Sequence, residues 1–296
     1  MSRVLVLSDG RMGHLNQSLA FVKYLDISYD VVSVKFKYRW LKALSYLLDK
    51  IGLYTDKLFN VQIDKKYDMV VGTGSTTSYA TKVLAKKMNA KSVAMMLPRG
   101  YRYDFDIIFA QSHDNPPKQK NIIEIPANFS YVEPQGIYRS KKQSIGIVIG
   151  GDNKLFTMSK EKLQTQLDYI VKAYAEYEIA ITTSPRTSEE VELLVASYGF
   201  DYEVLFSKNP INPIPDFLTL CETVFITGDS TSMISEAISY GKSNVVILPL
   251  EVQEENKFTR FIDTLEKEAF LHIFDGTVKN KNKKIDFKTY LKEVNI

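Results

Sequence analysis

The stretch FITGDSTSMISEA, residues 225–237, joins a strand-like run to a helix-like run within a few residues. Its β-branched run ends at Gly228-Asp229, and small hydroxyl residues crowd the junction. Serine is favoured immediately before the first turn of a helix, so we predict that Ser230 caps a helix running to about Tyr240. A strand that turns sharply into a helix is the repeating unit of a parallel α/β sheet. This stretch therefore decides the fold class.

The same alternation of β-branched runs and amphipathic stretches extends along the whole chain, which is typical of parallel sheets covered by helices. Residues 127–143 interrupt it with a proline, a glycine and basic residues but no periodicity, and we interpret them as a linker. The pattern predicts an α/β protein of two Rossmann-like, doubly wound domains facing each other across a cleft. We assign residues 1–138 to the first domain and 139–296 to the second, and the last helix can pack back on the first.

Composition narrows the function classes. Of the 296 residues, 45% are hydrophobic and 25% charged, as in ordinary globular proteins. Apolar runs are too short to cross a bilayer and no signal peptide is evident, so we expect a cytoplasmic protein. The single cysteine excludes an intramolecular disulfide, and the three histidines lie far apart, so we predict no metal site. A net charge of +3 is too small to indicate nucleic acid, but it suits a phosphate-bearing ligand or an anionic membrane face.

The first candidate turn is SDGRMGHLNQSL, residues 8–19. Gly10 and Gly13 permit tight backbone geometry and close approach of a ligand, and His14 falls near the start of the following helix. Histidine there can act as a general base at neutral pH, with Asp9 as the second candidate. In the alternative interpretation, Asp9 and the glycines only make a turn and His14 is a surface residue. The spacing leaves both open.

The second candidate turn is GIVIGGDNKLF, residues 146–156, which the ITTSPRT segment follows one strand later. Paired glycines bring backbone N–H groups close enough to cradle a phosphate, and the planar guanidinium of Arg186 suits a pyrophosphate. The alternative is that Arg186 is a solvated surface residue. The candidate nucleotide ligands in these segments are Gly150, Gly151, Asn153, Lys154, Thr183, Ser184 and Arg186.

In the helix after Ser230, a rotation of 100° per residue divides the side chains between two faces. One face carries Met233, Ile234, Ala237 and Ile238, and the other carries Ser232, Ser235, Glu236 and Ser239. The helix start offers free N–H groups and a positive dipole end, which suit a diphosphate. Glu236 can accept hydrogen bonds from both hydroxyls of a ribose whose phosphates lie at the helix start. In the alternative interpretation, Glu236 faces solvent. The candidate ligands here are Asp229, Ser230, Thr231, Ser232, Met233 and Glu236.

Residues 35–54 carry an amphipathic pattern, with Trp40, Leu44, Leu47, Leu48 and Ile51 on one helical stripe. Lysines and arginines border this stripe. Such a helix can lie in a membrane interface with its basic residues toward lipid headgroups, which would make the protein peripheral on the inner face of the membrane. The alternative is that the stripe packs in the core.

Several segments in order resemble the mitochondrial fission ELM family of glycosyltransferase-like proteins: SDGRMGHLNQ, FDIIFAQSHD, GGDNKLF, TTSPRT, NPI and ITGDSTSMISEAISYGK. The resemblance implies a GT-B architecture, with the acceptor site mainly in the first domain and the sugar nucleotide mainly in the second. It places Gly13-His14 at the reacting centre, Gly150-Gly151 and Arg186 at the diphosphate, and Glu236 at the ribose. The chain is also similar to the transferase that adds N-acetylglucosamine to a lipid-linked peptidoglycan precursor.

We therefore expect a metal-independent, inverting glycosyltransferase that uses a nucleotide-diphosphate sugar as donor and needs no cofactor. UDP is the commonest nucleotide for this fold, and a lipid-linked or cell-envelope glycan is the expected acceptor. Two alternatives stay open at this point. One is a sugar-nucleotide epimerase or hydrolase on the same fold, and the other is a non-catalytic scaffold protein that has kept the fold.

Overall fold

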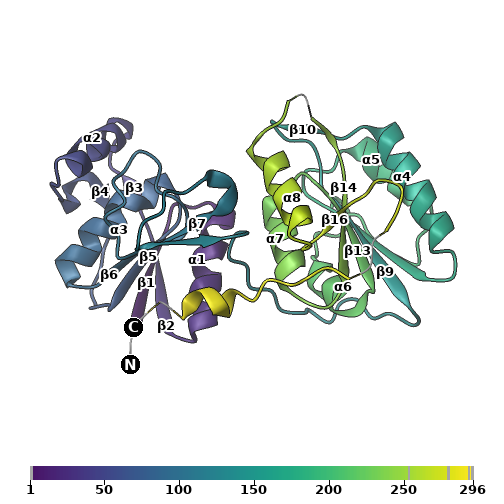
Figure 1. Ribbon diagram of the computed structural model, residues 1–296, viewed down its shortest axis with the longest axis horizontal. Coiled ribbons are helices and arrows are strands. Elements are labelled where there is room, and N and C mark those ends of the chain that lie inside the picture. The colour runs from purple at the N-terminus through teal and green to yellow at the C-terminus, as the bar shows by residue number, and fades with distance from the viewer. Residues whose placement is uncertain (1–2, 253, 279–280, 293, 295–296) are drawn as a thin grey trace. The chain divides into compact units, whose positions relative to one another are not determined.

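The computed structural model describes residues 3–252, 254–278, 281–292 and 294 (Figure 1). The chain forms two compact units, one of Met1–Tyr131 with Asp286–Ile296 and the other of Val132–Ile285. The division falls within the segment 127–143 that the sequence marks as a linker, a few residues before the assigned boundary at 138/139. Residues after 285 belong to the first unit.

The first unit is built on a six-stranded parallel sheet in the order β2-β1-β5-β6-β7-β8. Helices α1 and α3 lie on opposite faces of this sheet (Figure 1). Its elements are β1 (Arg3–Ser8), α1 (Met12–Leu25), β2 (Ser28–Ser33), β3 (Lys35–Phe36), α2 (Arg39–Lys50), η1 (Asp56–Leu58), β4 (Phe59–Asn60), β5 (Met69–Gly72), α3 (Ser75–Met88), β6 (Lys91–Ala94), β7 (Ile107–Gln111), η2 (Ser112–Asp114), β8 (Ile122–Ile125) and η3 (Phe287–Leu291).

The second unit contains another six-stranded parallel sheet, in the order β12-β11-β9-β13-β14-β16. Helices α4 and α5 cover one face, and α7 and α8 cover the other (Figure 1). Its elements are β9 (Ser144–Ile149), β10 (Phe156–Thr157), α4 (Lys160–Ala173), β11 (Glu178–Thr183), α5 (Glu189–Ala196), β12 (Tyr202–Val204), α6 (Ile214–Leu220), β13 (Thr223–Thr227), α7 (Thr231–Ser239), β14 (Asn244–Leu248), β15 (Glu251–Val252), α8 (Lys257–Lys267) and β16 (His272–Ile273).

Each sheet has a point at which the order of its strands reverses. In the second unit β9 lies between β11 and β13, and in the first unit β1 lies between β2 and β5. The chain leaves neighbouring strands toward opposite faces at such a point, so the loops diverge and leave a crevice beyond the carboxyl ends. The turns after β1, β9 and β13 all lie at these positions, which confirms the predicted doubly wound α/β class.

Burial explains why the β-branched runs form strands. Every residue of β9, β11 and β13 is buried, because helices cover both faces of the sheet. Each long strand predicted from such a run is present. The two-residue strands β4, β10, β15 and β16 were not predicted, since two residues carry no periodicity.

The predicted linker is irregular, but its second half is tightly bound to the second unit. The carboxylate of Asp216, at the start of α6, accepts hydrogen bonds from the backbone N–H groups of residues 135–138 at 2.8–3.1 Å. The Tyr138 hydroxyl donates to Glu178 at 2.9 Å. Burial raises the pKa of Asp216, but the four backbone hydrogen bonds outweigh it and lower the pKa. This part of the chain is therefore fixed to the second unit rather than a free tether.

Aromatic packing holds the C-terminal segment to the first unit. Phe287 of η3 is fully buried and stacks on Phe129 with ring centroids 4.5 Å apart. Phe129 in turn packs edge-on against Phe109 of β7 and Phe21 of α1. Complete burial of one such side chain contributes about 1.5–3 kcal/mol, which is enough to hold a short segment in place.

The predicted apolar stripe of helix α2 is partly buried and partly exposed, so neither interpretation of its sequence holds for all five residues. Leu44 and Leu48 pack against the core of the first unit, as the core interpretation predicts. Trp40, Leu47 and Ile51 are exposed, against that interpretation. The helix is short, and none of the helices within the described ranges has the length and apolar character needed to cross a membrane.

Replacing Asp216 tests how the linker is held. Asp216→Asn should lower the free energy of unfolding by about 2–4 kcal/mol at neutral pH, because the new amide group turns its own donors toward backbone N–H groups. Since the pKa of Asp216 is lowered in the folded state, the deficit should shrink as the pH falls through that pKa. Urea denaturation measures both effects.

Asp201→Asn is the matched control, because Asp201 accepts a single backbone hydrogen bond, from Ile179. An asparagine there keeps an oxygen for that one donor and should cost much less. Equal losses in the two variants would contradict the special role of Asp216.

Candidate functional site

Helix α7 begins where the sequence predicts. Ser230 is extended, and its side chain accepts a hydrogen bond from the Met233 N–H at 3.4 Å, so the predicted cap is confirmed. Within the described residues, the N–H groups of Thr231 and Ser232 have no acceptor. The first turn of α7 therefore presents two free donors at the positive end of the helix dipole.

The division of α7 into two faces is wrong at one position. Ile234, Ala237 and Ile238 are buried as predicted and Met233 is partly buried, but Ser235 is buried too. Its hydroxyl donates to the Thr231 carbonyl at 2.6 Å, which satisfies the polar group inside the helix itself. The buried arc is therefore wider than the apolar stripe, and Ser235 does not contribute to a polar wall.

Asp229 is the centre of the hydrogen bonding at this edge of the second sheet. Its buried carboxylate accepts hydrogen bonds from the Thr227 hydroxyl at 2.6 Å, the Arg186 guanidinium at 2.6 Å and the Gly151 N–H at 3.2 Å. Burial raises the pKa of Asp229, and these partners oppose the shift. One carboxylate thereby joins the ends of β9, β11 and β13.

The two glycines after β9 have a different role from the predicted one. Gly150 N–H donates to the Thr227 hydroxyl at 2.7 Å, and Gly151 N–H donates to Asp229, so neither group is free for a phosphate. A Cβ atom at Gly150 would lie 2.0 Å from the Asp229 carboxylate, and one at Gly151 would lie 1.9 Å from the Arg186 carbonyl. Glycine is required at both positions because other parts of the protein approach the backbone closely.

Of the three candidate ligands at the end of β11, Arg186 keeps donors for a ligand. Its side chain is 41% exposed and donates a hydrogen bond from one guanidinium nitrogen to Asp229. The Thr183 hydroxyl is instead used within the fold, donating to Glu192 at 2.6 Å and accepting from the Phe206 N–H. Ser184 shapes its own turn by accepting a hydrogen bond from the Arg186 N–H.

Asn153 and Lys154 were predicted to offer a donor and a positive charge to a phosphate. The first is used within the fold, and the second stays exposed. The Asn153 side chain donates to the Asp229 carbonyl at 3.0 Å and accepts from the N–H groups of Leu155 and Phe156. It is therefore a structural residue of the loop. Lys154 is exposed and lines a cavity of about 200 Å³ with residues 254–256.

Glu236 differs from every other carboxylate of this unit's candidate site. It lies on α7 beyond the first turn and is half-buried, yet among the described residues its side chain makes no hydrogen bond or ion pair. Burial raises the pKa of Glu236 from 4.5 to about 7. A desolvated carboxyl group without a partner is typical of a site that is completed by a ligand.

The first unit pairs the predicted base with the predicted carboxylate. His14 lies in the first turn of α1, and its Nδ1 is 2.9 Å from a carboxylate oxygen of Asp9. The Asp9 side chain is 3% exposed and that of His14 is 22% exposed. The carboxylate fixes the orientation of the ring, which leaves Nε2 for a substrate. Gly10 has φ +84°, a conformation that favours glycine, and makes the turn between them.

A further residue at this turn was missed. A Cβ atom at Gly74, which precedes α3, would lie 2.5 Å from the His14 ring, so the backbone of the β5–α3 turn forms one wall of the histidine's position. The turn is fixed to α1 by a 2.7 Å hydrogen bond between the Thr73 and Ser18 hydroxyls. The signal was the pair of glycines, Gly72 and Gly74, where β5 ends and α3 begins.

The remaining predicted ligands occupy the expected elements, and no metal cluster emerges. Gly13 lies in the first turn of α1, and its carbonyl accepts a hydrogen bond from Gln17.

Asp104 and Asp106 form the one Asp-x-Asp sequence of the chain, and they contact different partners, Lys82 and Ser92 respectively. In the part of the chain that the structure describes, no three His, Cys, Asp or Glu side chains are placed to hold a metal ion.

Comparison with known proteins agrees with this architecture. The family model described as Mitochondrial fission ELM1 matches residues 12–290. The uncharacterized protein RP120 of Rickettsia prowazekii (strain Madrid E) is 26% identical over 322 residues, which cover 92% of this chain and 90% of that protein.

Two solved structures are similar over most of the chain. MnaA of S. aureus, in a co-structure with UDP, has a TM-score of 0.50 and 13% identity, covering 99% of this chain and 87% of that one. MurG of Acinetobacter baumannii has a TM-score of 0.48 and 12% identity, covering 95% and 87%. At such identities the likeness to MnaA shows the fold alone. Together with the two parallel sheets, it identifies a GT-B type of α/β architecture.

Gly150→Ala tests the packing around Asp229. The added methyl group collides with the carboxylate, so we expect a loss of about 3 kcal/mol in the free energy of unfolding, measured by urea denaturation. Gly199→Ala is the control, because Gly199 has open space around it but φ +64°. It should cost about 1 kcal/mol from backbone conformation alone. A Gly150 variant no less stable than the Gly199 variant would contradict the close contact.

The raised pKa of Glu236 predicts a pH dependence of stability. The folded protein binds a proton there that the unfolded chain releases, so stability is lost as the pH rises from 4.5 through about 7. Glu236→Gln should remove this loss and be up to about 3 kcal/mol more stable than the wild type above pH 7. Below pH 4.5 the advantage should vanish. Denaturation across this range, with exposed Glu176→Gln in the turn after α4 as a control, measures it.

Proposed function

The chain belongs to the mitochondrial fission ELM1 family, and from its glycosyltransferase-like fold and the two candidate turns we propose that it is a metal-independent, inverting glycosyltransferase. Its donor in this proposal is a nucleotide-diphosphate sugar, with UDP as the nucleotide. The observation that carries the proposal is the pairing, on one helix, of N–H groups at the start of α7 with the carboxyl group of Glu236, both without a partner among the described residues.

For the diphosphate, the proposed ligands are the N–H groups of Thr231 and Ser232 and the guanidinium of Arg186. The helix start favours negative charge, and Arg186 has further N–H donors beyond the one that it gives to Asp229. Donors of this kind stabilise the leaving diphosphate without a bound metal ion. The presence of UDP in the MnaA structure supports the choice of nucleotide.

For the ribose, the proposed ligand is Glu236. Its carboxylate can accept hydrogen bonds from two vicinal hydroxyls, which would replace the water that burial removes. Because only the ionised form offers four acceptor sites, we expect nucleotide affinity to rise as the pH passes through the pKa of about 7.

For the chemical step, the proposed base is His14. In an inverting transfer an acceptor hydroxyl loses its proton to the base while its oxygen forms a bond to the anomeric carbon, and the bond from that carbon to the diphosphate oxygen breaks. His14 Nε2 takes the proton, and Asp9 orients the ring through Nδ1 and stabilises the resulting charge. A lipid-linked or cell-envelope glycan remains the proposed acceptor.

The experiment that tests the proposal measures thermal stabilisation by UDP, GDP and CMP sugars. A hundredfold excess of ligand over its Kd should stabilise the protein by about 2.7 kcal/mol. Glu236→Ala should weaken binding at least about tenfold, since it removes a hydrogen bond to a charged group. Exposed Glu189→Ala should bind as the wild type does.

Transfer is tested separately with the nucleotide that binds. His14→Asn should lower the rate of sugar transfer to an acceptor by about 10²–10⁴-fold while leaving nucleotide affinity nearly unchanged. Release of free sugar or an epimer without an acceptor would assign a hydrolase or epimerase instead. The lack of stabilisation by any nucleotide would overturn the proposal and favour a scaffold protein.

A further inference from the structure

Helix α2 presents an exposed apolar surface to solvent. Trp40, Leu47 and Ile51 are 63%, 57% and 61% exposed. They lie at positions i, i+7 and i+11, so they share one side of the helix. Tyr38, which stacks on Trp40 with its ring nearly parallel, and Leu53 extend this side beyond both ends of the helix. We call these five residues the α2 apolar surface.

This surface is not left over from a loosely packed helix. The opposite side of α2 is held firmly, with Leu41, Ser45 and Asp49 buried. Asp49, the only acidic residue of the helix, accepts a 2.7 Å hydrogen bond from buried Lys82 and another from the Arg102 N–H. The inward side thus fixes the rotation of the helix, so that the aromatic and aliphatic side chains point outward.

A basic cavity adjoins the start of α2. It has a volume of about 1010 Å³, and its lining includes the five lysines Lys37, Lys57, Lys65, Lys66 and Lys87. The same lining holds one acidic residue, Asp56, which pairs with Lys87 at 2.6 Å. Lys65 also pairs with Asp30 at 3.5 Å, so the positive charge of the cavity comes mainly from Lys37, Lys57 and Lys66.

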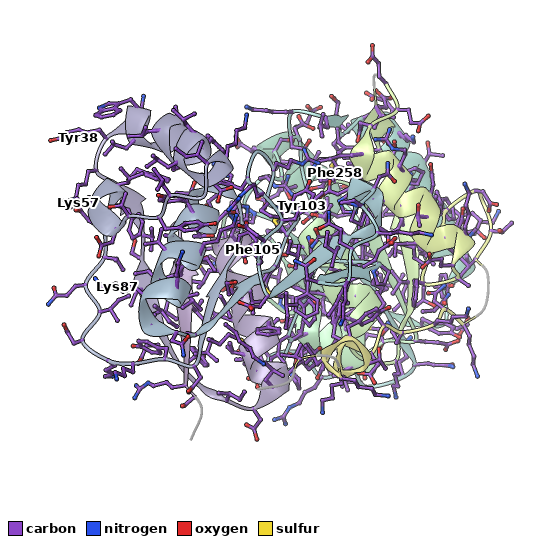
Figure 2. All side chains as sticks on the ribbon, turned by 60° about the vertical axis from the view of Figure 1, so that its left-hand side comes forward. Tyr38, Lys57, Lys87, Tyr103, Phe105 and Phe258 are labelled. Atoms are coloured by element: carbon purple, nitrogen blue, oxygen red, sulfur yellow. The ribbon has the colours of Figure 1, made fainter. Side chains whose placement is uncertain are left out.

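The cavity and the apolar surface belong to one side of the first unit. Lys37 lines the cavity and directly precedes Tyr38, and its N–H donates to the Leu58 carbonyl next to Lys57. Tyr38, Lys57 and Lys87 lie one below another toward the left of the view in Figure 2. The basic cavity and the α2 apolar surface thus adjoin each other at Lys37 and Tyr38.

From this arrangement we propose that the first unit docks on an anionic lipid bilayer through the α2 apolar surface. Trp40, Leu47 and Ile51 enter the interface between headgroups and acyl chains, and the lysines of the cavity contact lipid phosphates. Tryptophan and tyrosine favour the membrane interface, and cations beside an amphipathic helix add attraction to anionic lipids. The inference goes beyond the proposed function and does not depend on it.

The charge pattern favours a bilayer over a protein partner. Lysine is depleted from protein–protein interfaces, where the desolvation of its charge is costly. At a bilayer the ammonium groups stay among hydrated headgroups while only the apolar side chains leave water. The α2 apolar surface, with a lysine-lined cavity that begins at Lys37 beside Tyr38, meets that requirement.

Trp40 makes the test direct, because it is the only tryptophan of the chain. We expect its fluorescence to shift to shorter wavelength when the full chain is mixed with vesicles of phosphatidylglycerol and phosphatidylcholine, and brominated lipids should quench it. The shift should be much smaller with pure phosphatidylcholine, and it should weaken as ionic strength rises.

Matched variants separate apolar from electrostatic contributions while keeping Trp40 as the probe. Leu47→Ser should lower vesicle partitioning about tenfold or more, whereas Leu193→Ser, at a site 64% exposed on α5, should not. Lys37→Glu with Lys57→Glu should lower partitioning at least about fivefold per residue. Lys118→Glu with Lys120→Glu makes the same change in net charge elsewhere and should have a small effect.

Several results would overturn the proposal. They are the absence of any shift with anionic vesicles at low salt, equal partitioning into neutral vesicles, and equal losses in Leu47→Ser and Leu193→Ser. A Trp40 shift that grows with protein concentration without lipid would assign the surface to a second copy of the chain. Since none of these measurements involves a nucleotide, their failure is distinct from failure of the proposed function.

Discussion

The buried carboxylate of Asp229 holds the candidate site of the second unit together. It accepts hydrogen bonds from groups that follow three different strands, β9, β11 and β13, and so fixes the distances between their ends. Gly150 and Gly151 are required because the carboxylate and the Arg186 backbone occupy the space that a side chain would need. The orientation of Arg186 and the start of α7 follow from the same contact. A buried charge with fewer partners would be costly, so this network tolerates little change.

A consequence is that the turns at this edge use most of their polar groups on one another. What remains for a ligand is the first turn of α7, the outer donors of Arg186 and the carboxyl group of Glu236. The first unit likewise uses a polar group within its own site. Asp9 is nearly buried and occupies Nδ1 of His14, which leaves Nε2 for a ligand. In both units a carboxylate positions the group that is available for chemistry.

The α2 apolar surface adds a role that this chemistry does not need. Its outward side chains are aromatic and aliphatic, while the buried Asp49–Lys82 pair fixes the helix from inside. An exposed apolar stripe of this size lowers solubility unless something covers it. If the acceptor is lipid-linked, a docked first unit would be near its substrate, which would connect the two proposals without making either depend on the other.

The sequence by itself determined the fold class, the long strands and the cap at Ser230, because β-branched runs and helix-start residues act locally. It also identified His14 and Asp229 at strand-to-helix turns and Glu236 on the helix that follows Ser230. Only the tertiary structure decided what their neighbours do, since Gly150 and Gly151 bond to residues nearly eighty positions away. The wall that Gly74 forms beside His14 was not visible in the sequence, and the sequence left open whether Trp40 is exposed or packed in the core. Hydrogen bonds and packing between segments distant in the chain leave no periodic signal in the sequence.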